Sequence, residues 1–227
     1  MGAAMTILER LRARPADVAE RAPPAGCTAL GLTEGRDGLL HVPLAGVRRA
    51  SPLVVVLHGA GASGFDAMML LRDLCETRGL VLLAPDSRGS SWDFLRGGFG
   101  PDVAFIDRAL EHVFARCSID PARIALAGFS DGASYALSLG IANGDLFTHL
   151  IAFSPGFAAP KTQVGQPRVF VTHGTDDVVL PIERCSRLLV PRLRAGGHDV
   201  VYEEFDGGHK VPRELANRAI QWLVADA

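Results

Sequence analysis

A serine, an aspartate and a histidine that could cooperate in nucleophilic catalysis occur in this chain in that order. The serine, Ser130, lies in the run Gly128–Gly132, which reads Gly-Phe-Ser-Asp-Gly and follows an apolar stretch. A G-x-S-x-G pattern in that position predicts a sharp turn from a strand to a helix, with strained backbone and an exposed hydroxyl group. The pattern is short and also fits an ordinary Gly-Ser turn, so it indicates catalysis only together with a suitable acid and base elsewhere in the chain.

The two partners follow other predicted strands. Asp177 comes just after the apolar run 168–172, and His209 comes just after the run 199–205. The carboxyl ends of parallel strands meet at one edge of a sheet, so the three side chains can reach one crevice. The chain order Ser, Asp, His is that of α/β-hydrolases and differs from the orders in chymotrypsin and subtilisin.

The chemistry that these groups could perform is acyl transfer. A serine hydroxyl is a weak nucleophile until a neighbouring base takes its proton, which His209 would do. Asp177 would accept a hydrogen bond from the other ring nitrogen and fix the tautomer. The negative oxygen formed on attack needs amide donors, which we expect to be the backbone N–H groups of Asp131 and Ala60. His58, which precedes that second donor, is expected to support its loop through hydrogen bonds rather than to act in catalysis.

The segments that would position these groups alternate between strand and helix. Strands are expected at 53–57, 80–84, 123–127, 150–153, 168–172 and 199–205, and helices at 66–78, 102–116, 131–141, 182–195 and 212–224. Continuous apolar, β-branched runs such as 53–57 are typical of strands buried on both faces of a parallel sheet. The expected fold class is therefore α/β, with a mostly parallel central sheet covered by helices on both faces and ligands bound at the carboxyl ends of its strands.

The remaining features concern domain organisation and access to the site. The length of 227 residues suits a single domain over 1–227. The first 50 residues fit the alternation less well, and we expect a helix near 6–14 and an antiparallel strand near 39–42. Only residues 154–167 separate two successive strands after the nucleophile, which is too short for a helical cap. An open site without a lid domain is therefore expected.

Composition and spacing exclude several kinds of partner. The net charge is −2 and the basic residues are scattered, so neither nucleic acid nor an anionic membrane surface is an expected partner. No secretory signal and no apolar run of 18 residues is visible, which predicts a cytoplasmic protein without a membrane span. The four cysteines are widely spaced, and no metal-ligand or phosphate-loop motif occurs, so no metal and no cofactor is expected. Five further histidines, at 41, 112, 149, 173 and 198, lack a matching carboxylate or cysteine pattern and are expected to be structural.

From about Pro52 to its end the chain resembles the phospholipase/carboxylesterase group of α/β-hydrolases, relatives of acyl-protein thioesterases and dienelactone-hydrolase-like esterases. The resemblance is carried by the runs 57–62, 128–132, 173–181 and 207–209. In that family the acid is the aspartate four places before a proline, which implies Asp177 rather than Asp176. Asp131 is a departure, because acyl-protein thioesterases usually carry glutamine there, and it weakens the thioesterase interpretation.

The resemblance and the three groups together predict a serine hydrolase that cleaves carboxylic esters through an acyl-enzyme. A thioesterase or lysophospholipase would use the same groups, and a non-catalytic binding protein on the same fold is the alternative of another class. The expected partner is a small-molecule ester, and a homodimer is left open. Trp92, Met68 and Phe157 are predicted to contact the substrate, with Met69, Phe94, Phe99 and Phe153 as further apolar candidates for pocket or core.

Overall fold

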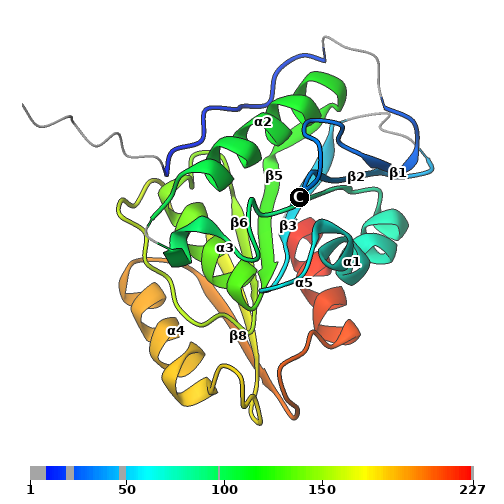
Figure 1. Cartoon of the computed structure of the whole chain (residues 1–227). Helices are drawn as coiled ribbons and strands as arrows, with labels where there is room; N and C mark the ends of the chain where they lie inside the picture. The colour runs from blue at the N-terminus through cyan, green and yellow to red at the C-terminus, as the bar shows by residue number, and fades with distance from the viewer. Residues whose placement is uncertain (1–8, 19–22, 46–49, 97, 226–227) are drawn as a thin grey trace, which may run out of the picture.

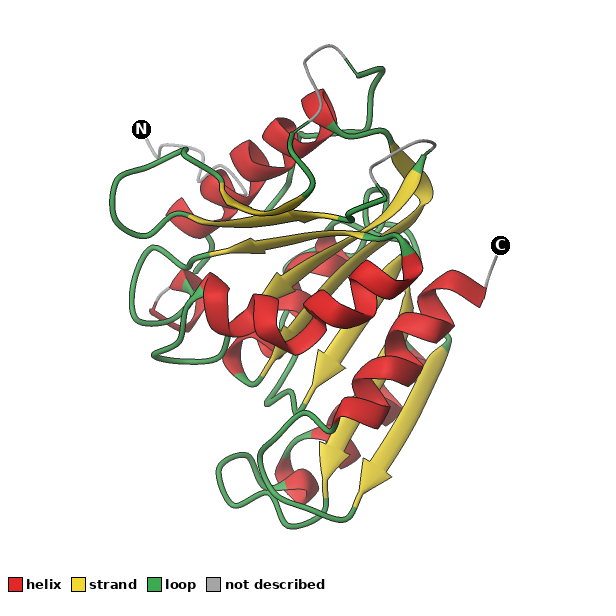
Figure 2. Ribbon diagram, turned by 90° about the vertical axis from the view of Figure 1, so that its right-hand side faces the viewer, coloured by secondary structure: helices red, strands yellow, loops and turns green. Residues whose placement is uncertain are grey.

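The computed structural model describes residues 9–18, 23–45, 50–96 and 98–225, and these form an eight-stranded sheet with helices on both faces (Figures 1 and 2). The strands are β1 (Gly26–Ala29), β2 (Gly38–Val42), β3 (Ser51–Leu57), β4 (Val81–Pro85), β5 (Ile119–Phe129), β6 (His149–Phe153), β7 (Arg168–Gly174) and β8 (Val200–Phe205). The helices are α1 (Gly64–Arg78), α2 (Pro101–Arg116), α3 (Asp131–Ala142), α4 (Ser186–Ala195) and α5 (Arg213–Ala225). Two short 3₁₀ turns, η1 (Asp93–Arg96) and η2 (Ile182–Arg184), complete the set of elements in these ranges.

The strand order is β1-β2-β4-β3-β5-β6-β7-β8. Strands β3 to β8 pair in parallel, whereas β2 pairs antiparallel with both β4 and β1. The predicted fold class and the predicted antiparallel strand near 39–42 are therefore confirmed. Because β5, β7 and β8 run in the same direction, the loops after them lie at one edge of the sheet.

Side chains alternate along the central strand between two apolar layers. Leu53, Val55 and Leu57 of β3 pack with α2, α3 and α4, whereas Val54 and Val56 pack with α1 and α5. Every one of these five side chains is fully buried. A strand with both faces covered needs apolar residues at consecutive positions, which explains why it shows no polar alternation.

Two elements differ from the sequence-based expectation. The helix expected at 182–195 begins as the 3₁₀ turn η2, and α4 starts only at Ser186, because Cys185 has non-helical dihedral angles (φ −116°, ψ −102°). The prediction of a helix at 6–14 is wrong for residues 9–14, which form no helix. Residues 6–8 lie outside the described residues. The structure also adds β1, which was not predicted. None of the helices in the described ranges is long and apolar enough to cross a membrane.

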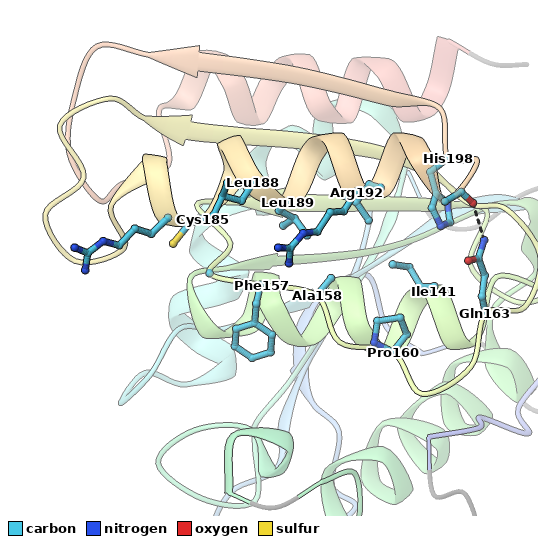
Figure 3. A pocket seen from close by; sticks show the side chains of 14 residues that line it. Ile141, Phe157, Ala158, Pro160, Gln163, Cys185, Leu188, Leu189, Arg192 and His198 are labelled. Atoms are coloured by element: carbon cyan, nitrogen blue, oxygen red, sulfur yellow. Dashed lines mark hydrogen bonds between the residues drawn. The ribbon is translucent and has the colours of Figure 1, made fainter.

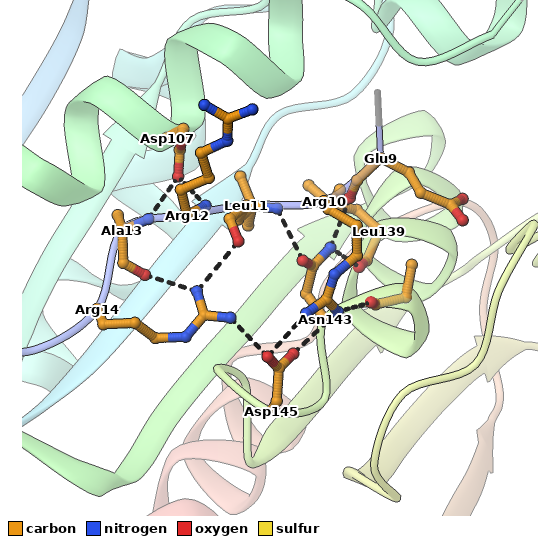
Figure 4. A network of polar contacts seen from close by, with 11 residues as sticks. Glu9, Arg10, Leu11, Arg12, Ala13, Arg14, Asp107, Leu139, Asn143 and Asp145 are labelled. Atoms are coloured by element: carbon orange, nitrogen blue, oxygen red, sulfur yellow. Dashed lines mark hydrogen bonds and ion pairs between the residues drawn. The ribbon is translucent and has the colours of Figure 1, made fainter. Parts of the chain in front are cut away.

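Residues 9–14, here called the strap, lie in an extended form across α2 and the end of α3 (Figure 4). The Leu11 amide donates to Asn143 Oδ1 at 2.8 Å, and the Ala13 amide donates to Asp107 Oδ1 at 2.8 Å. Asn143 Nδ2 donates in return to the Glu9 carbonyl at 2.7 Å. Backbone groups of the strap thus pair with side chains of the body, so the sequence pattern of the strap alone does not decide its conformation. The Leu11 and Ala13 side chains are buried in the layer beside α2 and α3.

Asn143→Ala is expected to lower the free energy of unfolding by about 3 kcal/mol, because it leaves several buried backbone groups without a partner. Asn143 is fully buried and also donates to the Leu139 carbonyl at 2.8 Å. Urea unfolding followed by circular dichroism would measure the loss. A loss below about 0.5 kcal/mol, the range of ordinary surface changes, would show that the Asn143 hydrogen bonds to the strap add no stability.

The ion pairs between the strap and Asp145 predict a dependence of stability on pH. Hydrogen bonding from Arg10, opposed by burial and aided by Arg14, lowers the pKa of Asp145 from its ordinary value of 3.8 to about 2. A carboxyl with a lowered pKa in the folded protein stabilises it above the ordinary pKa, and this stabilisation is lost as the pH falls through the folded pKa. Because the Asp145 side chain is 36% exposed, Asp145→Asn is expected to cost about 1 kcal/mol or less at pH 6. The difference from wild type should vanish between about pH 4 and pH 2 in urea unfolding experiments, and a difference that persists at pH 2 would contradict the assignment.

Candidate active site

Ser130 occupies the turn between β5 and α3 with a left-handed backbone conformation (φ 57°, ψ −119°). Such a conformation is costly for a residue with a side chain and is maintained only by its surroundings. The turn also requires the flanking residues Gly128 and Gly132, because it leaves no room for a side chain at either position. A Cβ atom on Gly128 would lie 2.2 Å from the Gly132 carbonyl oxygen, and one on Gly132 would lie 2.3 Å from the Leu57 carbonyl oxygen. The G-x-S-x-G pattern therefore forms the sharp strand-to-helix turn that it predicts.

Ser130, His209 and Asp177 form a continuous hydrogen-bonded chain. His209 Nε2 lies 2.9 Å from Ser130 Oγ, and His209 Nδ1 lies 2.6 Å from Asp177 Oδ2. Ser130 lies in the turn after β5, Asp177 in the loop after β7 and His209 in the loop after β8. Ser130 and Asp177 are both buried, at 8% and 4% exposed.

The Asp177 carboxylate is held by donors on both oxygens. Oδ1 accepts the amides of Val179 at 2.9 Å and Leu180 at 2.8 Å, while Oδ2 faces His209. Burial raises the pKa of Asp177, but the hydrogen bonds from Leu180, His209 and Val179 outweigh burial and lower the pKa below its ordinary value. Asp177 is therefore an anion over the whole neutral range.

Asp176 is exposed, and its amide donates to the Gly207 carbonyl at 3.0 Å. Its backbone thus ties the loop after β7 to the loop that carries His209. Of the two neighbouring aspartates, Asp177 is the one whose carboxylate reaches the His209 ring.

His173, which is expected from the sequence to be a structural histidine, lies beside the hydrogen-bonded chain of Ser130, His209 and Asp177. Its Nε2 lies 2.7 Å from the Leu180 carbonyl and 3.3 Å from Asp177 Oδ2, and its Nδ1 lies 2.6 Å from Ser186 Oγ. Burial lowers the pKa of His173. A neutral ring can donate from Nε2 and accept the Ser186 hydroxyl at Nδ1. His173 and His41 thus each have a carboxylate neighbour that no sequence pattern indicated, and for His41 it is Glu76, whose Oε2 lies 2.9 Å from Nε2.

A pocket of about 420 Å³ opens beside Ser130. It is lined by His58, Gly59, Ala60, Ala62, Asp66, Ala67, Leu70, Phe129, Ser130, Val179 and His209. The loop after β3, which carries Ala60, thus faces the same space as the serine. Asp131 is the first residue of α3, and its carboxylate accepts a hydrogen bond from Ser91 Oγ at 2.7 Å.

The three residues predicted to contact substrate lie outside that lining set. Trp92 is fully buried and donates from Nε1 to the His58 carbonyl at 2.9 Å. Met68 is 1% exposed and packs in the layer beside α1 and α5. Apolar residue type and position in the chain cannot separate a pocket wall from the core, and the structure places both side chains in the core.

Phe157 lines a different pocket, of about 270 Å³, between α4 and the segment 156–163 (Figure 3). Leu188, Leu189 and Arg192 of α4 form its opposite wall. The segment 154–167 contains neither helix nor strand, so the stretch expected to be too short for a cap is irregular backbone. Within the ranges that the structure describes, no three His, Cys, Asp or Glu side chains gather in a way that could hold a metal ion.

Comparison with known proteins gives a consistent family assignment. Residues 103–224 match the family model described as phospholipase/carboxylesterase. A segment of 108 residues is 32% identical to acyl-protein thioesterase 1 of Gibberella zeae; it covers 43% of this chain and 46% of that protein, so the match spans about half of the relative's length.

Solved structures of similar shape agree on the fold. The crystal structure of esterase PE8 is 25% identical, with a TM-score of 0.68 over 82% of this chain and 96% of that one. The Bacillus cereus carboxylesterase is 17% identical, with a TM-score of 0.65 over 86% and 96% of the two chains, and that likeness concerns the fold alone. Because the family model covers more than half of the sequence, the chain belongs to the phospholipase/carboxylesterase family of α/β-hydrolases.

Proposed function

We propose that this protein is a serine hydrolase that cleaves carboxylic esters, with Ser130 as nucleophile, His209 as general base and acid, and Asp177 as the group that orients the histidine. The observation that carries the proposal is the hydrogen-bonded chain from Ser130 Oγ through the His209 ring to Asp177. Such a chain activates a hydroxyl that is otherwise a weak nucleophile at neutral pH.

The proposed reaction has two halves that use the same groups. Ser130 Oγ bonds to the ester carbonyl carbon while its proton passes to His209 Nε2, and the carbonyl electron pair moves onto oxygen. The intermediate then expels the alcohol, which takes the proton from His209 and leaves an acyl-enzyme. Water attacks the acyl carbon with His209 as base, and the proton returns to Ser130 Oγ as the acid departs. Only protein groups and water take part.

The proposed donors to the negative oxygen are the backbone N–H groups of Ala60 and Asp131. Asp131 begins α3, where the first amides of a helix have no partner within the helix. Ala60 lines the pocket beside Ser130. Preformed amide donors stabilise the charge that develops during attack without having to reorganise, and this favours the transition state over the bound ester.

The proposal is tested with p-nitrophenyl acetate and p-nitrophenyl butyrate, together with a fluorophosphonate probe. We expect hydrolysis of both esters, inhibition by the probe, and a single probe adduct that maps to Ser130 by peptide mass spectrometry. An inactive, correctly folded protein that the probe leaves unlabelled would support the non-catalytic alternative instead.

A thioester is the second candidate substrate, and the observation in its favour is the similarity to acyl-protein thioesterase 1. Phenyl butyrate and thiophenyl butyrate differ only in the leaving atom, so the ratio of their kcat/KM values separates the two activities. Asp131 places a carboxylate beside the nucleophile, which we expect to disfavour anionic acyl groups in either case. A ratio that favours the oxygen ester would support the carboxylesterase, and a ratio that favours the thioester would support the second candidate.

A further inference from the structure

Arg36, in the connection between β1 and β2, reaches across to the loop after β3. Its Nη2 donates to the Ala62 carbonyl at 3.0 Å and lies 3.2 Å from His58 Nε2. The same guanidinium bonds the loop after β4, through both the carbonyl and the hydroxyl oxygen of Ser87. One side chain thus joins three loops beside the pocket.

The neighbours of His58 determine its tautomer. Nε2 faces two donors, the Ser87 amide at 3.0 Å and the Arg36 guanidinium at 3.2 Å, so this nitrogen has to be an acceptor. Nδ1 lies 2.7 Å from the Gly59 carbonyl oxygen, so it has to carry the proton and donate. Burial lowers the pKa of His58, and the nearby Arg36 charge adds to this effect. The ring is therefore neutral and held in one orientation.

The hydrogen bond from His58 fixes the peptide group that joins Gly59 to Ala60. The Gly59 carbonyl and the Ala60 N–H belong to the same planar trans unit, so they point in opposite directions. When His58 Nδ1 holds the carbonyl, the Ala60 N–H has a fixed direction away from it. The side chain of Trp92, which donates to the His58 carbonyl at 2.9 Å, braces the preceding peptide group in the same way.

We propose that Arg36 is a positioning residue for the oxyanion donor Ala60, acting through the orientation of the His58 ring. This inference rests on the proposed function, because it assigns a role in stabilising the negative oxygen formed by Ser130. The sequence gives no sign of this role, since Arg36 lies outside every motif of the family and before the region of resemblance. A donor displaced from its position loses part of its effect on the transition state while substrate binding is retained.

The competing explanation is that Arg36 only anchors the segment between β1 and β2 to the body of the protein. Arg108 provides a matched control, because its Nη2 donates to the Leu32 carbonyl of that same segment at 3.0 Å. In the described part of the chain, Arg108 has no hydrogen bond to the loop after β3. Arg36→Gln and Arg108→Gln both remove one cationic anchor of the segment, but only the first removes a contact to His58.

The experiment compares wild type, R36Q, R36K and R108Q in steady-state hydrolysis of p-nitrophenyl butyrate. We expect R36Q to lower kcat about 10- to 100-fold with KM changed less than about 3-fold, since complete loss of one oxyanion donor costs about 100- to 1000-fold. R36K keeps a positive charge and N–H donors but lacks the planar guanidinium group, so its kcat should lie between those of R36Q and wild type. R108Q should keep wild-type kcat. Affinity for a trifluoromethyl ketone, which forms a hemiketal oxyanion on the serine, should fall in R36Q by the same factor as kcat/KM.

A second measurement reports on His58 without turnover. In ¹⁵N-histidine NMR spectra, His58 of the wild type should show a protonated Nδ1 and an unprotonated Nε2. R36Q should keep this tautomer, because the Ser87 amide still donates to Nε2, but its Nε2 resonance should shift because the guanidinium donor is lost. Wild-type kcat in folded R36Q, or equal losses in R36Q and R108Q, would overturn the inference. If R36Q does not fold, a wild-type kcat together with a wild-type inhibitor affinity in R36K would overturn the inference instead. Failure of the proposed function looks different, because the wild type itself would then be inactive and Ser130 unlabelled.

Discussion

Ser130→Ala is expected to lower kcat for p-nitrophenyl butyrate by about a million-fold, to a rate set by binding and the oxyanion donors alone. The hydroxyl is the only part of the side chain that is removed, and it is the atom that would form the acyl-enzyme. Alanine meets the same strain as serine at φ 57°, so the turn and the fold should persist. Initial rates at high enzyme concentration, corrected for buffer hydrolysis, would measure the fall.

Ser154→Ala is the matched control for this change. Ser154 follows β6, is fully buried, and shares the positive φ of Ser130, at 49°. Its Oγ has no hydrogen-bond partner among the described residues. We expect Ser154→Ala to keep kcat within about 3-fold of wild type, because no group of the proposed reaction depends on that hydroxyl. If Ser130→Ala kept the activity of this control, Ser130 would not be the nucleophile.

Asp177→Asn is expected to lower kcat by about 10,000-fold, the size of effect seen for the same change in a serine protease triad. An amide could present an N–H to His209 Nδ1, and the ring would then turn its proton towards Ser130 and lose its role as base. The amides of Val179 and Leu180 can still donate to an amide oxygen at this position, so the loop should keep its shape. Binding of the ester is not affected directly, and the loss should therefore appear in kcat with little change in KM.

Asp176→Asn is the control for this prediction. It removes one negative charge from the neighbouring position, but the Asp176 carboxylate is exposed and the residue bonds the Gly207 loop through its backbone. We expect less than a 5-fold change in kcat, because an exposed charge near the site is screened by solvent. A larger loss for Asp176→Asn than for Asp177→Asn would reverse the assignment of the acid.

Much of the fold could be predicted from the sequence because its signals are local. A strand covered on both faces shows as a continuous apolar run, as in β3, and the helices show as apolar periodicity with stop signals. The nucleophile turn was predictable because the five-residue pattern 128–132 marks it, although Gly132 is required by a contact with Leu57 of another strand. The strap was not predictable, because its backbone bonds Asn143 and Asp107, more than 90 positions away.

By itself, the sequence determined the α/β class, the turn at Ser130, and the order in which Ser130, Asp177 and His209 reach one edge of the sheet. Only the tertiary structure decided which side chains face the pocket: it buried Trp92 and Met68 and brought Arg36 to His58. The physical reason is that hydrophobic pattern and turn chemistry depend on neighbours in the chain. The direction of a buried side chain and the tautomer of a histidine depend instead on partners that only folding brings together.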